Sequence, residues 1–413
     1  MTLKTPTANR KEARTSLFPE LDRDLRELHT TGILPTQRMR ELVAAGRITT
    51  AAGVEPVQEH QFQPASIDLR LGQVAYRVQA SFLPGASSTV EAKLQELKMS
   101  EVDLTRPAVF ERGCVYVVPL LEELYLPSDV SGKSNPKSTT GRLDIFTRLI
   151  TDYGTEFERV PKGYKGKLYV EIVPRTFTVL LQAGARLNQI RLIRGSPWPL
   201  ESEHMLGRVE QKAPLVYNDQ SPTKASIARG LRIHIDLEGS DPAQGGEIIG
   251  FRAKKNTPAV DLAKVNHYPA KDFWEPIYGA PGQRLILNPD DFYILVSQER
   301  VSIPPEYAAE MVAYDPSMGE FRVHYAGFFD PGFGYGPSSD VGGTHAVLEV
   351  RSHEVPFVLE HGQIVGRLIY ERLTEIPEKI YGPSIGSSYQ YQRLSLSKQF
   401  RSEWKNQRRS NGA

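Results

Sequence analysis

Two groups of residues have types and spacings suited to chemistry on an anionic substrate. The first is the polar turn KSTTGR at residues 137–142, which offers a lysine, three hydroxyl groups and a glycine ahead of an arginine. Hydroxyls, backbone N–H groups and a cation on one turn suit a phosphate or another anion. The second is Glu171, the single carboxylate in the strand-like run KLYVEIV. Such a carboxylate suits proton transfer, so the two groups together predict an anion site with one general base.

The neighbours of Glu171 bear on this interpretation, because a glutamate within a strand is ordinarily a solvated surface residue. Side chains alternate along a strand, so Leu168 and Val170 share one face. Tyr169, Glu171 and Val173 share the other. That second face is not wholly polar, and we therefore expect Glu171 to be at least partly enclosed.

The overall composition indicates which elements must position these residues. The chain has 413 residues, 40% of them hydrophobic and 24% charged, as in an ordinary globular protein with room for two or three domains. Its 30 prolines and 33 glycines are spread along the sequence and predict many short strands and turns. We therefore expect a mainly β fold.

Several classes of partner are disfavoured by the same composition. The formal net charge of +1 gives no electrostatic footprint for nucleic acid. No apolar run reaches membrane-spanning length and the N-terminus has no signal-peptide pattern, so no membrane partner is expected. Cys114 is the only cysteine, which excludes an intrachain disulfide and favours a reducing, cytoplasmic setting.

The sequence contains an internal duplication. SIDLRLG corresponds to LRIHIDLEG, RVPKGYKG to FFDPGFGYG, KLYVEIVP to HAVLEVRS, and TVLLQAGARLNQIRLIRG to FVLEHGQIVGRLIYERL. Order and spacing are kept over roughly 150 residues. We predict two tandem β domains with a few short helices. Their bounds are an extension at 1–30, a first domain at 31–205, a linker at 206–228 and a second domain with a tail at 229–413.

Four features occur in an order that is known from one protein family. They are ILPTQRMRELVAAGRI with QFQPASIDLRLG, the KSTTGR turn, Glu171 after a Gly-containing corner, and the C-terminal tail. On these the chain resembles the dCTP deaminases, which belong to the trimeric dUTPase-like β-barrel superfamily. The residues that match the family's motifs are Lys137, Ser138, Thr139 and Arg142 in the turn, Glu171 as the catalytic glutamate, and Tyr381, Gly382, Ser388, Tyr389 and Gln392 in a lid-like tail.

The two halves depart from the family's pattern in opposite ways. In the first half Lys137 replaces an arginine and Pro161 replaces the acidic residue of the corner. The second half keeps the corner, with Asp330, and the carboxylate as Glu349. It lacks the turn, because AYDPSMGEF places Ala313 and Ser317 at the serine and arginine positions. We therefore expect one working site per chain, in the first half, with the second half structural and lending its tail and Asp330 as a lid.

The resemblance implies hydrolysis of dCTP to dUTP and ammonia, which supplies dUTP for thymidylate synthesis. Glu171 acts as the general base, Ser138 holds the attacking water, and Arg142 orients the glutamate or stabilises developing charge. The triphosphate is expected on the 137–141 turn, with Mg²⁺ bridging its oxygens and no metal held by the protein. The substrate contacts expected besides these are Lys137, Thr139, Thr140, Gly141, Tyr169, Val170, Asp330, Tyr381, Ser388 and Gln392.

Zinc is not expected in this reaction. Most deaminases activate water on a zinc ion held by His/Cys/Cys or Cys₃ ligands. A chain whose only cysteine is Cys114 cannot supply that ligand set. Deamination by this protein is therefore predicted to be zinc-independent.

Other functions stay open at this point. A dUTP diphosphatase of the same fold attacks phosphorus and needs an acidic residue beside the α-phosphate, where the first half has Pro161. A bifunctional enzyme that makes dUMP follows if Asp330 completes the site. The degenerate second half also fits a non-catalytic nucleotide-binding module. The superfamily implies a trimer-based homo-oligomer with sites at subunit interfaces.

Overall fold

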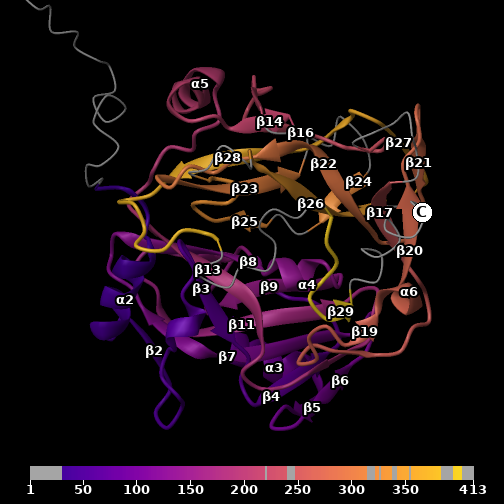
Figure 1. Cartoon of the computed structure of the whole chain (residues 1–413). Coiled ribbons are helices and arrows are strands. Elements are labelled where there is room, and N and C mark those ends of the chain that lie inside the picture. Colours follow the sequence, from indigo (N-terminus) through magenta and orange to yellow (C-terminus); the bar gives the residue numbers. More distant parts are fainter. Residues whose placement is uncertain are drawn as a thin grey trace, which may run out of the picture.

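The computed structural model describes residues 30–218, 221–239, 247–313, 321–324, 327–336, 342–352, 355–382 and 394–401. The chain forms two β units, the first drawn in indigo to magenta and the second mainly in orange (Figure 1). Strands far outnumber helices, and the expected mainly β fold of two tandem units is confirmed. None of the described helices is long and apolar enough to cross a membrane.

The first unit is built from two main sheets and a separate ribbon. Its elements are β1 (Gly32–Ile33), α2 (Thr36–Ala44), β2 (Ile48–Thr50), η1 (Glu59–Gln61), β3 (Ile67–Arg70), β4 (Val74–Val78), α3 (Val90–Leu97), β5 (Lys98–Asp103), β6 (Ala108–Phe110), β7 (Val115–Tyr125), β8 (Val130–Pro136), α4 (Ser138–Gly141), β9 (Ile145–Thr151), β10 (Arg159–Val160), β11 (Lys165–Pro174), β12 (Val179–Leu181) and β13 (Arg186–Arg194). One sheet has the order β1-β13-β8-β10, with β3 also on β13. The other has the order β5-β4-β7-β11-β9, with β2 on β7, and the separate ribbon consists of β6 and β12.

The second unit repeats this plan. Its elements are α5 (Glu203–Lys212), β14 (Val216–Asn218), β15 (Ser221–Thr223), β16 (Leu231–His234), β17 (Ile248–Ala253), β18 (Val260–Asp261), β19 (Tyr268–Pro269), α6 (Ala270–Phe273), β20 (Trp274–Tyr278), β21 (Arg284–Leu287), β22 (Tyr293–Val301), β23 (Tyr307–Ala313), β24 (Phe321–His324), β25 (Phe328–Phe329), β26 (Thr344–Ser352), β27 (Phe357–Glu360), β28 (Ile364–Arg372) and β29 (Phe400–Arg401). One sheet runs β15-β14-β22-β17-β20, with β26 between β22 and β24, and another runs β16-β28-β23-β25.

The pairing of the strands confirms the internal duplication. β13 pairs with β8 and β3, as β28 pairs with β23 and β16. β11 lies between β7 and β9, as β26 lies between β22 and β24. Glu171 and Glu349 therefore hold equivalent places. Glu171 is in register with Arg148 on β9, and Glu349 is in register with His324 on β24.

The strand that carries Glu171 is covered on both faces. Leu168, Val170 and Ile172 lie in the main core between the sheets. Tyr169 packs on the opposite face, in a smaller cluster that includes Leu94 of α3. Helix α3 thus covers the face of β11 on which Glu171 lies, and Glu171 is fully buried, in line with the expectation that it is at least partly enclosed.

Residues 206–228, where we expected a linker, carry regular structure. They include most of α5 together with β14 and β15, and β14 pairs with β22. Leu206, Val209, Leu215 and Val216 are buried in the core of the second unit. This stretch is therefore held by apolar packing against the second unit. The extension predicted for residues 1–30 falls outside the described residues except for its last residue.

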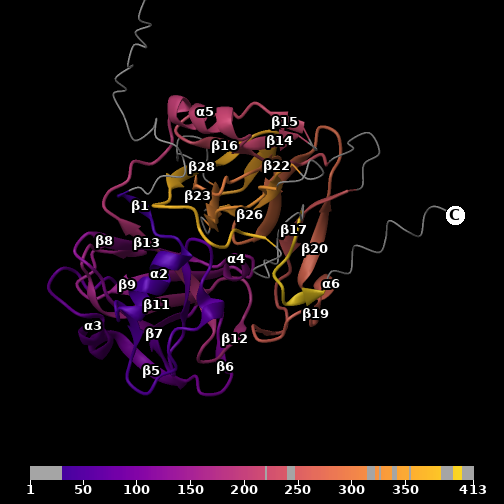
Figure 2. The same cartoon turned by 60° about the vertical axis from the view of Figure 1, so that its left-hand side comes forward.

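The two units interlock along one side. β18 of the second unit adds in parallel to β12 of the first. The C-terminal segment 394–401 returns beside α6, where β29 pairs with β19 (Figure 2). There Phe400 joins Phe177 and Trp274 in one aromatic cluster, with ring centroids 5.5 Å apart for Phe177 and Trp274 and 5.9 Å apart for Trp274 and Phe400. Apolar burial thus fixes both the relative placement of the units and the path of the C-terminal segment.

Candidate active site between the two units

A cavity lies between the two units and takes its polar lining from both. The first unit contributes the turn after β8, and the second contributes the β25 corner, β26 and two points near the C-terminus. The lining residues are Pro136, Lys137, Ser138, Gly141, Arg142, Met311, Gly327, Phe328, Phe329, Asp330, Phe333, His345, Val347, Glu349, Tyr381 and Ser395.

The KSTTGR turn forms the single helical turn α4. Lys137 is extended, with φ −69° and ψ 149°, and its carbonyl accepts from the N–H groups of Thr140 at 2.8 Å and Gly141 at 3.0 Å. The Thr140 hydroxyl donates to the Leu187 carbonyl at 2.8 Å, which ties the turn to β13. Asp144, with a φ of 54°, lies in the left-handed region just after the turn.

One face of this turn points into the cavity. Ser138, Gly141 and Arg142 are three and four residues apart, so they share a side of the turn, and all three line the cavity. Thr139 and Thr140 belong to the other side and do not line it. Arg142 is only 6% exposed, and its Nη1 donates to the Ser395 carbonyl at 3.0 Å. The C-terminal segment therefore helps to aim the guanidinium.

Glu349 faces Arg142 across the cavity. It lies in the middle of β26, is only 6% exposed, and has Oε1 4.0 Å from Arg142 Nε. Burial raises the pKa of Glu349 to about 8, although the Arg142 charge opposes the shift. A carboxyl group that titrates near neutral pH is suited to accept and return protons.

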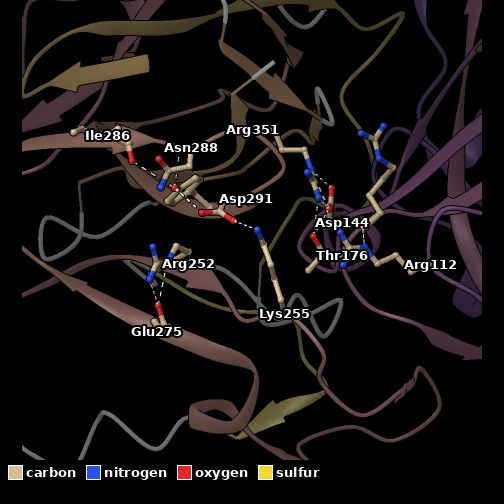
Figure 3. Close-up of polar contacts among 12 residues, drawn as sticks. Arg112, Asp144, Thr176, Arg252, Lys255, Glu275, Ile286, Asn288, Asp291 and Arg351 are labelled. Carbon is tan, nitrogen blue, oxygen red and sulfur yellow. Dashed lines mark hydrogen bonds and ion pairs between the residues drawn. The ribbon is translucent and has the colours of Figure 1, made fainter. Parts of the chain in front are cut away.

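A second contact from β26 holds the end of the turn. Arg351 lies two residues after Glu349 and therefore on the same side of the strand. Figure 3 shows its guanidinium reaching Asp144 and Thr176 of the first unit. Arg351 Nε donates to Asp144 Oδ2 at 3.0 Å, Nη2 also reaches that oxygen, and Nη2 donates to Thr176 Oγ1 at 2.7 Å. One strand thus positions both Glu349 and the backbone beyond Arg142.

The second unit contributes two further predicted residues. Asp330, from the Gly-rich corner after β25, lines the cavity, and burial raises its pKa while the Arg191 charge opposes the rise. Tyr381 also lines it, with its ring 5.4 Å from that of Phe333 and its N–H donating to the Pro331 carbonyl at 2.7 Å.

Comparison with known proteins shows which family the chain belongs to. Residues 30–196 match the model of the 2'-deoxycytidine 5'-triphosphate deaminase N-terminal domain, and residues 202–400 match that of the C-terminal domain. The chain belongs to the dCTP deaminase family. The dUTPase-like fold expected from the sequence is confirmed by this assignment and by the structural likeness described next.

Solved and curated relatives agree with the assignment. The crystal structure of 2'-deoxycytidine 5'-triphosphate deaminase from Agrobacterium tumefaciens is 50% identical, with a TM-score of 0.75, and covers 84% of this chain and 100% of that one. The "dCTP deaminase, dUMP-forming" of Mycolicibacterium vanbaalenii is 32% identical over 39% of this chain and 80% of its own length. That of Parafrankia sp. is 30% identical over 42% and 81%.

The carboxylate to which the sequence analysis gave the catalytic role does not line this cavity. Glu171 is fully buried in the centre of β11 and is not among the residues that line the cavity. Its Oε1 accepts from Arg148 Nη2 at 2.7 Å, and the Arg148 guanidinium lies 3.5 Å from the centre of the Phe157 ring. Tyr169 and Val170 are buried beside it and do not line the cavity either.

Of the other predicted residues, some line the cavity and some do not. Lys137, Ser138, Gly141, Arg142, Asp330 and Tyr381 come together, whereas Thr139 and Thr140 face away from this cavity. Ser317, Ser388, Tyr389 and Gln392 lie outside the described residues. Within the described part of the chain, no cluster of three or more His, Cys, Asp or Glu side chains is arranged to hold a metal ion.

Glu349 was recognised in the sequence but not assigned a catalytic role. The available signal was complementarity between the halves: the first half keeps the turn and has Pro161 in its corner, whereas the second keeps Asp330 and Glu349. Two partial sites of opposite composition make one complete site if the halves face each other.

Proposed function

We propose that this protein deaminates dCTP by hydrolysis at a site that the two units share. The proposal is supported by one observation above the rest, that Ser138 and Arg142 of the first unit line the same cavity as Glu349 of the second. The family assignment makes the cytosine nucleotide the natural substrate. Glu349 therefore takes the role that the sequence suggested for Glu171.

The reaction adds water to C4 of the cytosine ring. Glu349 accepts the proton of the attacking water and delivers protons to N3 and to the amino group. The C4–N bond then breaks, ammonia leaves, and the ring becomes uracil. Ser138 holds the water, and Arg142 stabilises the negative charge that develops near the glutamate. A positioned general base contributes about 10²–10⁴ to a rate, so orientation in the cavity supplies most of the remainder.

The two equivalent glutamates have different partners. Glu171 accepts hydrogen bonds from Arg148 through both Nε and Nη2, at 3.0 and 2.7 Å, so a guanidinium already occupies its Oε1. Glu349 lies 4.0 Å from the nearest Arg142 nitrogen and has a pKa raised to about 8 by burial. These differences favour Glu349, and the role of Glu171 as base stays a prediction for the same experiment to test.

A second candidate is a bifunctional reaction that releases dUMP. Curated relatives carry the name "dCTP deaminase, dUMP-forming", and Asp330 adds a second carboxyl group to the cavity. Attack of water on the α-phosphate requires such a group together with the Mg²⁺ that accompanies a triphosphate. In that reaction Mg²⁺ would enter with the substrate and would neutralise phosphate charge, with few ligands from the protein. A trimer-based homo-oligomer and a role in supplying uracil nucleotides for thymidylate synthesis stay predictions.

The decisive experiment is incubation with dCTP and Mg²⁺, with ammonia, dUTP, dUMP and pyrophosphate measured together. Ammonia with dUTP indicates deamination alone, and ammonia with dUMP and pyrophosphate indicates the bifunctional reaction. Binding of dCTP without ammonia would leave only a nucleotide-binding module. The matched variants Glu349→Gln and Glu171→Gln then show which carboxyl group the chemistry requires.

A further inference from the structure

A strap formed by residues 373–381 leads from the end of β28 to the cavity that contains Glu349, and it crosses the first unit on the way. Its last residue, Tyr381, lines that cavity. Figure 1 shows the strap, in yellow, passing beside α2. The strap belongs to the second unit and α2 to the first. The place of Tyr381 in the cavity wall therefore depends on contacts that cross the boundary between the units.

Apolar packing fixes the beginning of the strap. Leu373 forms a parallel β-bridge with Ile33, and both are buried in a small cluster with Ala65 and Ala308. The Thr374 N–H donates to the Ile33 carbonyl at 2.9 Å. The strap thus starts from a point where the two units are already in contact.

The side chain of Gln37, on α2, holds the middle of the strap. Gln37 Nε2 donates to the Ile376 carbonyl at 2.9 Å, and Gln37 Oε1 accepts from the Glu378 N–H at 3.2 Å. One side-chain amide thus satisfies a backbone acceptor and a backbone donor two residues apart, as a neighbouring β-strand would. Pro377, between these two residues, is buried. The backbone of the strap is therefore tied to α2 at its midpoint.

Ion pairs with the first unit flank this amide. The strap residues that form them are Glu375, Glu378 and Lys379, and their partners are Arg38, Arg40 and Glu59. Arg38 Nε lies 2.7 Å from Glu375 Oε1, and Arg40 Nη1 lies 2.7 Å from Glu378 Oε2. Arg40 also pairs with Glu59, so the pairs share partners. A single exposed pair contributes little, whereas several charges in one network contribute more.

The far end of the strap packs tightly against the corner that carries Asp330. Gly332 in that corner has a φ of 92°, and a Cβ there would lie 2.8 Å from Ile380 Cβ and 3.0 Å from the Tyr381 nitrogen. The Tyr381 N–H also donates to the Pro331 carbonyl. Close packing leaves little room for the end of the strap to move by itself. A shift of the strap beside α2 therefore displaces the cavity wall.

We propose that Gln37, Arg38 and Arg40 are positioning residues for the active site, which hold the strap so that Tyr381 forms one wall around the substrate. The inference rests on the proposed function, because it takes the cavity beside Glu349 as the place of the substrate. None of these three residues lines that cavity, so each acts through the strap. Their ion pairs are partly exposed, so salt weakens the hold of α2 on the strap.

The test is a double-mutant cycle between α2 and Tyr381. Gln37→Leu and Arg40→Gln should each raise KM for dCTP about fivefold with kcat nearly unchanged, as expected when one or two surface hydrogen bonds are lost. In a Tyr381→Ala background the same substitutions should not raise KM further, because the residue through which they act is gone. Arg252→Gln is the control, since it breaks an exposed ion pair to Glu275 and neither residue lines the cavity. An unchanged KM in both variants, or equal increases with and without Tyr381, would overturn the proposal.

Hydrogen exchange measures the strap directly and needs no turnover. Amide hydrogens in the peptide that contains residues 374–381 should exchange about fivefold faster in Gln37→Leu than in wild type, because the Glu378 N–H loses its acceptor. In wild type their exchange should also become faster between about 0.05 M and about 0.5 M salt, and this salt effect should shrink in Arg40→Gln. Exchange that Gln37→Leu leaves unchanged would overturn the proposal.

The same variants keep this inference separate from the proposed function. If wild-type protein releases no ammonia from dCTP, the deaminase proposal fails. The cycle is then measured on the dissociation constant for dCTP, obtained by calorimetry. Faster exchange in the strap of Gln37→Leu with an unchanged dissociation constant contradicts a positioning role, and weaker binding that depends on the presence of Tyr381 supports it.

Discussion

Arg191 of the first unit and Asp330 of the second form an ion pair of 3.3 Å beside the proposed active site, with Arg191 only 1% exposed. The same guanidinium donates to the carbonyls of Ala309 at 3.0 Å and Phe329 at 2.9 Å. It also lies 3.9 Å from the centre of the Phe328 ring. One buried side chain thus fixes the corner that carries Asp330, and it does so across the boundary between the units.

Replacing Arg191 should change the pH dependence of substrate binding. Burial already raises the pKa of Asp330, and loss of the opposing Arg191 charge should raise it further. Asp330 will then be protonated at higher pH, so KM for dCTP in Arg191→Met should rise progressively as pH falls. Steady-state kinetics across pH measures this, and Asp330→Asn should remove the pH dependence. Arg194→Met, from the same strand but with an exposed ion pair to Asp129, is the control.

Glu349→Gln should lower kcat by at least about 10²–10⁴ while leaving the protein folded. Glu171→Gln should behave differently, because it leaves Arg148 without its buried partner. Removing one member of such a pair costs about 3–5 kcal/mol when it is fully buried and less here, since the Arg148 side chain is 26% exposed. Turnover per folded molecule should be retained. Ammonia release and urea unfolding measure the two effects, and equal loss of turnover in both variants contradicts the assignment to Glu349.

The pH–rate profile should carry the titration of Glu349. With a pKa raised to about 8, its ionised fraction grows across the neutral range, so kcat/KM should increase with pH up to about 8 and then level off. A profile that is already flat from about pH 5 would indicate a base with an ordinary carboxyl pKa.

The free energy of unfolding should change with pH in the direction opposite to kcat/KM. Between the ordinary pKa of 4.5 and about 8, folded Glu349 keeps a proton that the unfolded chain has lost. The free energy of unfolding therefore falls as pH rises through this window. Glu349→Gln lacks this dependence, so the stability of wild type relative to the variant should decline from about pH 5 to pH 8. Denaturant titrations at several pH values measure the difference, and a constant difference argues against a buried, protonated Glu349.

Arg351→Met should destabilise the fold and distort the KSTTGR turn. It leaves the carboxylate of Asp144, which is fully buried, without its guanidinium. Breaking such a pair costs about 3–5 kcal/mol. Arg284→Met is the control, since Arg284 and Glu360 form an exposed pair that contributes less than about 1 kcal/mol. Similar unfolding midpoints for the two variants would show that Arg351 does not anchor the turn.

The repeated fold was predictable because local patterns carry it. Alternating apolar residues, turn signals and matched spacing identify equivalent strands without knowledge of the tertiary structure. The KSTTGR turn was also found correctly as a local element, since its residues are contiguous.

The choice between Glu171 and Glu349 could not be made from local pattern, because each glutamate lies at the same point of an equivalent strand. What separates them is the residue across the sheet, Arg148 on β9 and His324 on β24, and this depends on register between distant segments. Glu349 faces Arg142 because of the way the two whole units dock. The periodicity of a single strand does not encode that docking.

The junction of both units in one polypeptide has a consequence for how the site assembles. A turn and a glutamate on separate subunits would meet only above some protein concentration, whereas here their encounter is intramolecular and governed by a fixed effective concentration. Dilution cannot separate the turn from the glutamate. Specific activity should therefore stay constant at enzyme concentrations where an enzyme that depends on reversible subunit association would lose activity.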